Sequence, residues 1–114
     1  MAKYESRFWG DFRDFLGFLD NKMLRGRSSA SYEDGSYYEK DDVRCAVRVY
    51  ERFGSMGSTH VCLTIVLIGV DKELFLSAIS AGGSQAKFFK ISTVGERKFL
   101  QSVVDIVEEY RKRK

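Results

Sequence analysis

The residue types that this sequence lacks restrict its chemistry from the start. Its 114 residues contain no proline, one histidine and two cysteines. A chain without proline suits uninterrupted strands and helices, because proline removes a backbone hydrogen-bond donor. The single histidine, His60, has no partner at the spacing of a zinc site. We therefore expect no metal ligands, and we expect Cys45 and Cys62 to be free thiols.

Long apolar segments are also missing. The longest apolar run, Val61 to Val70, is about half of the roughly 20 residues that a membrane helix needs. The first ten residues, MAKYESRFWG, lack the apolar core of a secretion signal. These features predict a cytoplasmic protein without a membrane partner.

Charge of one sign is not in marked excess. The 19 basic and 16 acidic residues are interspersed and leave a net charge of +3. A nucleic-acid-binding domain usually carries a larger and more clustered basic excess, so this balance argues against a polyanionic partner. The residues assemble into no acid–base pair, activated nucleophile or cofactor motif. We therefore assign no catalytic residue and no cofactor, and we expect a protein that is not an enzyme.

A glycine-rich stretch, LSAISAGGSQAKFFKIS at 76–92, raises the question of a phosphate-binding loop. Such a loop lies between a strand and a helix whose N-terminus faces the anion. Here the residues after the glycines, 85–91, have the pattern of another strand. The stretch therefore favours a plain hairpin turn at Gly83-Ser84.

The N-terminal part of the chain predicts a strand followed by a helix. Residues 3–9 alternate weakly, as in a short strand, and Asp11 is placed to cap a helix that follows. Apolar residues then recur at helical spacing, at Phe12, Phe15, Leu16, Leu19 and Met23. This helix should end at Arg25-Gly26, where the glycine is able to take the left-handed conformation.

The rest of the chain predicts a strand meander and a second helix. Strands are expected at 28–33, 43–53, 59–69, 74–81 and 85–91, with a hairpin turn at Asp34-Gly35. The second helix should begin at the capping box Thr93-x-x-Glu96 and bury Phe99, Val103, Ile106, Val107 and Tyr110. We predict one α+β domain over 1–114 in the order β-α-β5-α. It is a two-layer sandwich, in which an antiparallel meander of about five to six strands carries two helices on one face.

A strand register follows if Phe53 pairs with Thr59 across the intervening loop. Cys45 and Cys62 then lie on opposite faces of the sheet, which excludes a disulfide between them. The helix-covered face would carry Val43, Cys45, Val47, Val49, Val61, Leu63, Ile65 and Leu67. The outer face would also carry apolar side chains, where a wet face should be polar: Val66, Ile68, Phe75, Ile79 and Phe88.

We expect this apolar outer face to be an interface with a second copy of the chain, which makes the protein a homodimer. Two alternatives to a second copy stay open. The register could be shifted by one residue, or the first strand and Trp9 could cover the face.

Two further binding hypotheses stay open beside self-association. A stripe on the outer face, Arg44, Arg48 and Arg52 with Tyr50, is a candidate anion site that could act with the basic tail, 110–114, on nucleic acid. The modest net charge favours a solvated strand face paired with neighbouring acids, and a third interpretation makes these arginines the polar rim of a dimer interface. A small apolar ligand between the sheet and the C-terminal helix is the other alternative.

Two segments, DVRCAVRVYERF (42–53) and ELFLSAISAGGSQAKFFKI (73–91), resemble a family of short bacterial proteins, mostly from Gram-positive organisms. That family is catalogued as a domain of unknown function, so the resemblance implies no activity, cofactor or site residue. The strand–helix–meander–helix order resembles TATA-binding-protein-like and helix-grip folds, which bind DNA or apolar ligands or form dimers. The apolar outer face, and not the resemblance, predicts a non-enzymatic interaction or scaffold module that self-associates through that face.

Overall fold

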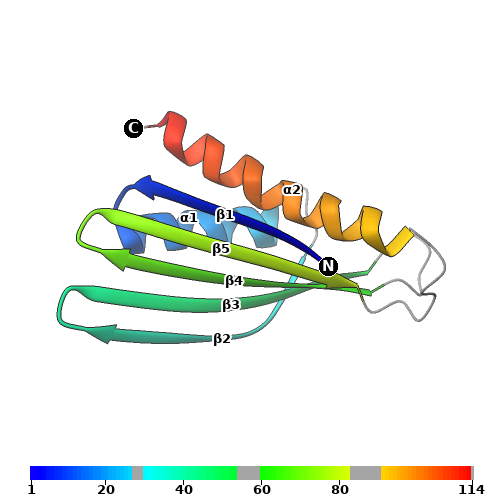
Figure 1. Ribbon diagram of the computed structural model, residues 1–114, viewed down its shortest axis with the longest axis horizontal. Helices are drawn as coiled ribbons and strands as arrows, with labels where there is room; N and C mark the ends of the chain where they lie inside the picture. Colours follow the sequence, from blue (N-terminus) through cyan, green and yellow to red (C-terminus); the bar gives the residue numbers. More distant parts are fainter. Residues whose placement is uncertain (27–29, 54–59, 83–90, 114) are drawn as a thin grey trace.

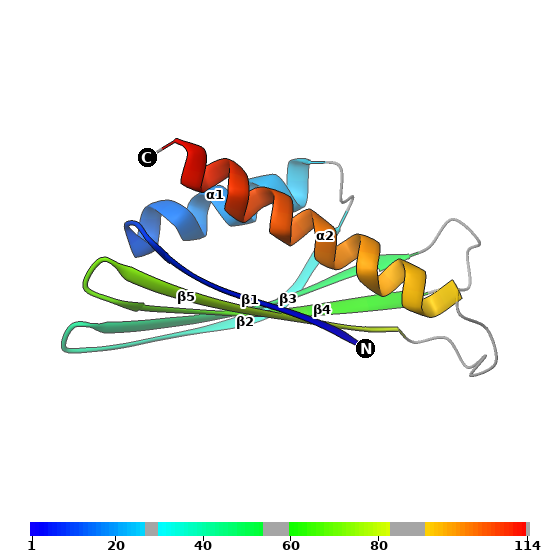
Figure 2. The same cartoon turned by 45° about the horizontal axis from the view of Figure 1, so that its top comes forward.

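The computed structural model describes residues 1–26, 30–53, 60–82 and 91–113, without the side chains of 53 and 91–96. The elements in chain order are β1 (Ala2–Trp9), α1 (Phe12–Arg25), β2 (Ser31–Lys40), β3 (Val43–Phe53), β4 (His60–Val70), β5 (Glu73–Gly82) and α2 (Ile91–Lys112). The strands form one open antiparallel sheet in the order β1-β5-β4-β3-β2 (Figure 1). Both helices lie on the same side of it (Figure 2). The predicted α+β class is confirmed.

Helix α1 forms for the reasons that its sequence suggested. The Asp11 carboxylate accepts a hydrogen bond of 2.9 Å from the backbone N–H of Asp14, which satisfies a donor of the first turn. The buried face consists of Phe12, Phe15, Leu19 and Met23. The helix ends at Arg25 as expected, but Gly26 is extended, with φ −91°, and not left-handed.

Helix α2 begins at Ile91, so Thr93 lies inside the helix and the prediction that it is the N-cap is wrong. The apolar face is confirmed: Phe99, Val103, Ile106, Val107 and Tyr110 are all buried. This helix packs over β5, β1 and β4. Tyr110 lies in an aromatic cluster with Phe8 and Phe15, whose ring centroids are 6.3 and 4.9 Å from its own.

The predicted hairpin turn at Asp34-Gly35 is wrong. Strand β2 runs through both residues to Lys40, and the chain turns at Asp41, which has a left-handed φ of 55°. Asp71 has a φ of 56° in the matching turn between β4 and β5. Aspartate tolerates this conformation because its short side chain can hydrogen-bond locally. The predicted turn at 83–84, most of the predicted strand 85–91 and Phe88 lie outside the described residues; Ile91 itself is helical.

The predicted pairing of β3 with β4 is wrong by one residue. Phe53 pairs with His60, not with Thr59, and Val47 therefore pairs with Val66. Because side chains alternate along a strand, a shift of one residue turns the whole of β3 over. Its valines and Cys45 lie on the outer face, while Ala46 and Tyr50 are buried under the helices.

The shift also moves one of the two cysteines, because Cys45 lies on the outer face and not on the helix-covered face that the expected register gave it. Cys45 pairs with Ile68 and Cys62 pairs with Glu51, so both cysteines are on the outer face. They are far apart along the ladder and both are free, as expected. The prediction that they lie on opposite faces is wrong, but its consequence, two free thiols, stands.

Candidate interaction surface

The sheet face opposite the helices, which we call the outer face, carries a contiguous apolar patch. No described segment lies over it (Figure 2). Val43, Val70 and Ile79 are 38%, 41% and 39% exposed, and the other members are half-buried. The whole patch comprises Val43, Cys45, Val47, Val49, Val66, Ile68, Val70, Phe75 and Ile79. Patches of this kind mark interaction sites in soluble proteins.

Strand register makes the patch continuous. Four cross-strand rows follow one another along the strands, each running from β2 to β1. They are Lys40-Val43-Val70-Glu73-Trp9, then Tyr38-Cys45-Ile68-Phe75-Arg7, then Ser36-Val47-Val66-Ser77-Glu5, then Asp34-Val49-Thr64-Ile79-Lys3. Residues paired in this way have neighbouring side chains. The centres of the rows are mostly apolar, and their ends on the two edge strands are polar or aromatic.

Four of the predicted interface residues lie on this patch. Ile68 is paired with Phe75, Val66 lies one row along β4, and Ile79 belongs to the fourth row. The alternative covering by the first strand is wrong, because β1 is an edge strand of the same sheet and Trp9 is 71% exposed. The shifted register did occur, and it enlarged the patch by moving the β3 valines onto this face.

One end of the outer face is polar. The imidazole Nε2 of His60 lies 3.0 Å from the Glu51 carboxylate, and Cys62 pairs with Glu51 across the strands. Burial, and then the charges of Glu51 and Glu33, raise the pKa of the Cys62 thiol. A thiol with a raised pKa is a weak nucleophile. Among the described residues no His, Cys, Asp or Glu cluster could hold a metal ion.

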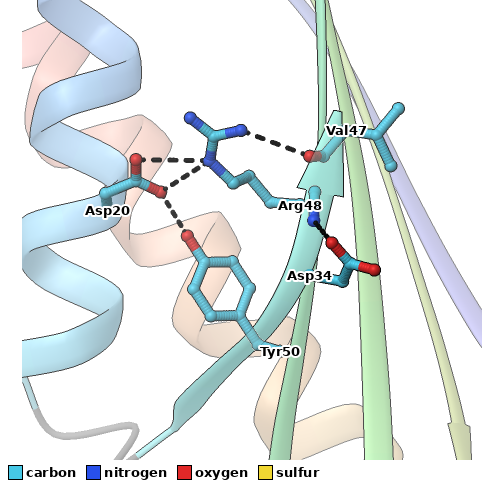
Figure 3. A network of polar contacts seen from close by, with 6 residues as sticks. Asp20, Asp34, Val47, Arg48 and Tyr50 are labelled. Atoms are coloured by element: carbon cyan, nitrogen blue, oxygen red, sulfur yellow. Dashed lines mark hydrogen bonds and ion pairs between the residues drawn. The ribbon is translucent and has the colours of Figure 1, made fainter. Parts of the chain in front are cut away.

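The predicted arginine stripe does not lie on the outer face. Its residues alternate with the β3 valines, so the same shift of one residue places Arg44, Arg48, Arg52 and Tyr50 on the helix side. The Nε of Arg48 donates to both Asp20 oxygens, at 3.2 and 3.3 Å, and the Tyr50 hydroxyl donates to the same carboxylate (Figure 3). Asp20 thus ties α1 to β3.

Burial and the bond to Asp20 raise the pKa of Tyr50 far above its ordinary value. The ring of Tyr32 lies beside this network, 5.9 Å from the Tyr50 ring and 5.9 Å from the Arg48 guanidinium carbon. Gly35 leaves room for that ring, because a Cβ there would lie 2.5 Å from the Tyr32 hydroxyl oxygen. These contacts link α1, β3 and β2 around the buried Tyr50 ring, so the network serves the fold.

The other two arginines of the stripe also contact the protein itself. The Arg44 Nε lies 3.5 Å from the Glu39 carboxylate. The Arg52 guanidinium lies 4.6 Å above the Phe99 ring, and burial lowers its pKa. Sequence reasoning missed Asp20, the residue that orders the centre of the stripe. The available signal was an acid on the covering helix together with an Arg and a Tyr two residues apart on one strand.

Comparison with known protein families gives a match over nearly the whole chain. Residues 1–111 match the family described as "Family of unknown function (DUF6054)". The chain belongs to this family. A search of curated proteins finds no match. The expectation of a family without an assigned activity is confirmed.

The structure also bears on the other binding hypotheses. A shallow groove of about 380 Å³ lies beside α1 and β2, lined by Phe12, Arg13, Leu16, Gly17, Asp20 and Tyr37. The expected place for an apolar ligand was between the sheet and α2, where Phe99, Val103 and Val107 are fully buried in the core.

Across the described residues, no helix has the length and apolar character needed to cross a membrane.

Proposed function

We propose that this protein is a self-associating module whose outer sheet face binds a second copy of the chain. The observation that carries the proposal is the apolar patch, which lies at the centre of the sheet on the side away from both helices. An antiparallel sheet with one wet face should alternate apolar and polar residues. Here β3 carries its valines on the outer side, β4 adds Val66, Ile68 and Val70, and β5 adds Phe75 and Ile79.

The polar ends of the rows favour a second copy as the partner. Two sheets that pack face to face lie about 10 Å apart. We place the two-fold axis midway between the two sheets, perpendicular to the strands and between the second and third rows. The first row of one copy then faces the fourth row of the other, and the second row faces the third. Ile68 then faces Val66 of the other copy, and Cys45 faces Val47.

The same axis brings opposite charges together at both edges. On β2 the exposed Lys40 faces Asp34 of the other copy, and on β1 Arg7 faces Glu5. The polar end with Glu51 and His60 falls beyond the fourth row and stays in water. A buried apolar centre with a charged, self-complementary rim is the usual anatomy of a protein–protein interface.

A charge in the middle of the patch tests the proposal. We expect Ile68→Asp to halve the solution mass measured by light scattering, because it buries a carboxylate in the interface. Leu24→Asp is the matched control, since Leu24 is 47% exposed on α1. Both variants should keep the wild-type circular dichroism. Equal masses for the wild type and Ile68→Asp would overturn the proposal.

The proposal includes no catalytic step. The bacterial origin, the cytoplasmic location and the likeness to TATA-binding-protein-like or helix-grip folds stay predictions from the sequence. Binding of an apolar ligand or of nucleic acid also stays a prediction. The placement of Arg48 and Arg52 against Asp20 and Phe99 favours the self-association proposal over a nucleic-acid surface.

A further inference from the structure

The two edge strands of the sheet differ in their readiness to pair. Strand β2 has a register shift between Tyr32 and Asp34, and such bulges discourage pairing at an edge. Strand β1 pairs with β5 over eight consecutive residues, Ala2 to Trp9, with no shift. An edge strand that is long and regular is a template for another strand.

One hydrogen bond fixes which backbone groups of β1 point outward. The Gly10 N–H donates to the Lys72 carbonyl, at 2.9 Å, in continuation of the β1–β5 register. In an antiparallel pair, residues alternate between those that bond the neighbour and those that point away. Even-numbered residues of β1 therefore bond β5. The N–H and C=O groups of Lys3, Glu5, Arg7 and Trp9 point toward the open edge.

The side chains of these four residues, three of them charged, favour one register for a second copy. A two-fold axis at Glu5 or at Arg7 would set like charges opposite each other. An axis at Tyr4 would pair Lys3 with Glu5 but leave Arg7 and Trp9 without a partner strand. An axis at Ser6 sets Glu5 opposite Arg7 and Lys3 opposite the exposed face of Trp9, in both directions.

We infer that β1 pairs antiparallel with β1 of a second copy, with Ser6 opposite Ser6. The outward N–H and C=O groups of Glu5 and Arg7 then bond each other across the axis, and the two sheets become one. On the helix side Tyr4 lies opposite Phe8. The edge contact is made by backbone groups of β1, whereas the outer-face contact is made by the apolar side chains of β3, β4 and β5; the Glu5 and Arg7 charges contribute to both.

The two self-interactions are geometrically compatible. The edge axis at Ser6 lies between the rows of Arg7 and Glu5, which are the second and third rows of the outer face. The axis proposed for the outer face runs between the same two rows. If both contacts form, the axes cross and close a four-chain assembly, which is a common symmetry for homo-oligomers.

Proline at position 5 gives a sharp test. The Glu5 N–H points away from β5, so Glu5→Pro removes an interchain donor and leaves the β1–β5 ladder complete. We expect Glu5→Pro to raise the concentration at which the assembly dissociates by about tenfold or more. Glu5→Ala is the matched control and keeps the backbone donor. Equal dissociation of Glu5→Pro and Glu5→Ala, with both folded, would overturn the inference.

A cross-link tests the register even if the proline variant unfolds. In a background with Cys45 and Cys62 replaced by alanine, Ser6→Cys should form an interchain disulfide on mild oxidation, because it faces itself across the axis. Tyr4→Cys should not, because it faces Phe8. No excess of cross-linking at position 6 over position 4 would contradict the register.

The two proposals can be refuted independently of each other. Addition of Ile68→Asp to the Ser6→Cys chain removes the outer-face contact alone, and cross-linking at position 6 should persist. If Ile68→Asp halves the solution mass but Ser6→Cys forms no interchain disulfide, the edge pairing is overturned and the outer-face proposal stands.

Discussion

Removal of the Asp20 carboxylate should destabilise the fold, because it leaves two donors of β3 without an acceptor. The Tyr50 side chain is fully buried, so water cannot easily replace the lost partner of its hydroxyl. That loss should cost about 2 kcal/mol. The Arg48 side chain is 18% exposed and can recover part of its hydration, so its loss should add about 1 kcal/mol. We expect Asp20→Ala to lower the free energy of unfolding by about 3 kcal/mol.

Urea denaturation at one fixed protein concentration measures this change, because self-association makes stability depend on concentration. A double-mutant cycle with Tyr50→Phe isolates the coupling. When both groups are absent no buried hydroxyl is left unpaired, so the double variant should be more stable than the sum of the single losses predicts, by about 1 kcal/mol.

The control is Glu108→Ala, which removes an exposed carboxylate 3.4 Å from Arg111. Exposed pairs contribute little, so this change should stay within about 0.5 kcal/mol of the wild type. If Asp20→Ala were as mild as Glu108→Ala, or if the cycle showed no coupling, the network would not hold α1 on the sheet.

Three further changes test the packing. Burial and a bond to Asp14 raise the pKa of Tyr110 to about 12, and Tyr50 is raised further, while an unfolded tyrosine titrates near pH 10. The free energy of unfolding should therefore be unaffected by these groups below about pH 10 and fall above it by about 1.4 kcal/mol per pH unit for each tyrosine. In urea titrations between about pH 10 and 12, the Tyr110→Phe variant should lack the part of this loss that comes from Tyr110. Gly17→Ala should raise the free energy of unfolding by about 1 kcal/mol, because the added Cβ meets nothing within 4 Å on α1; a loss would contradict the open space there. Gly69→Ala should lower the thermal midpoint, at a cost of about 1–3 kcal/mol, because its Cβ would lie 2.8 Å from the buried Phe12 ring; an unchanged midpoint would refute that close approach.

Local signals predicted the bounds of α1 and the buried face of α2, but not where α2 begins. In α1 an N-cap at Asp11 and an apolar period of helical spacing agree, and both depend on residues within a few positions of each other. The prediction of the β2–β3 turn was wrong because Asp34-Gly35 is a strong hairpin signal. The turn that forms has Asp41 in a left-handed conformation. At Asp34 a bulge absorbs the irregularity without a reversal of the chain.

The face assignment of β3 could not be obtained from its own pattern. Valines alternate with Arg48 and Tyr50, and apolar residues normally face the core. Tertiary partners reverse this preference, because Asp20 on α1 satisfies both polar side chains while the Tyr50 ring fills the core. The pairing of β3 with β4 differs by one residue from the expected one, and that shift exchanges the two faces. The outer patch was predicted in part, since Val66, Ile68, Phe75 and Ile79 lie on strands whose faces the sequence assigned correctly.

The most direct measurement of the central claim is the solution mass of the unmodified chain by light scattering across a dilution series. Self-association through the outer face predicts a mass that is a multiple of 13.1 kDa at high concentration and falls on dilution or stays above one chain throughout. A mass of 13.1 kDa at every concentration would contradict both the outer-face contact and the β1 edge pairing.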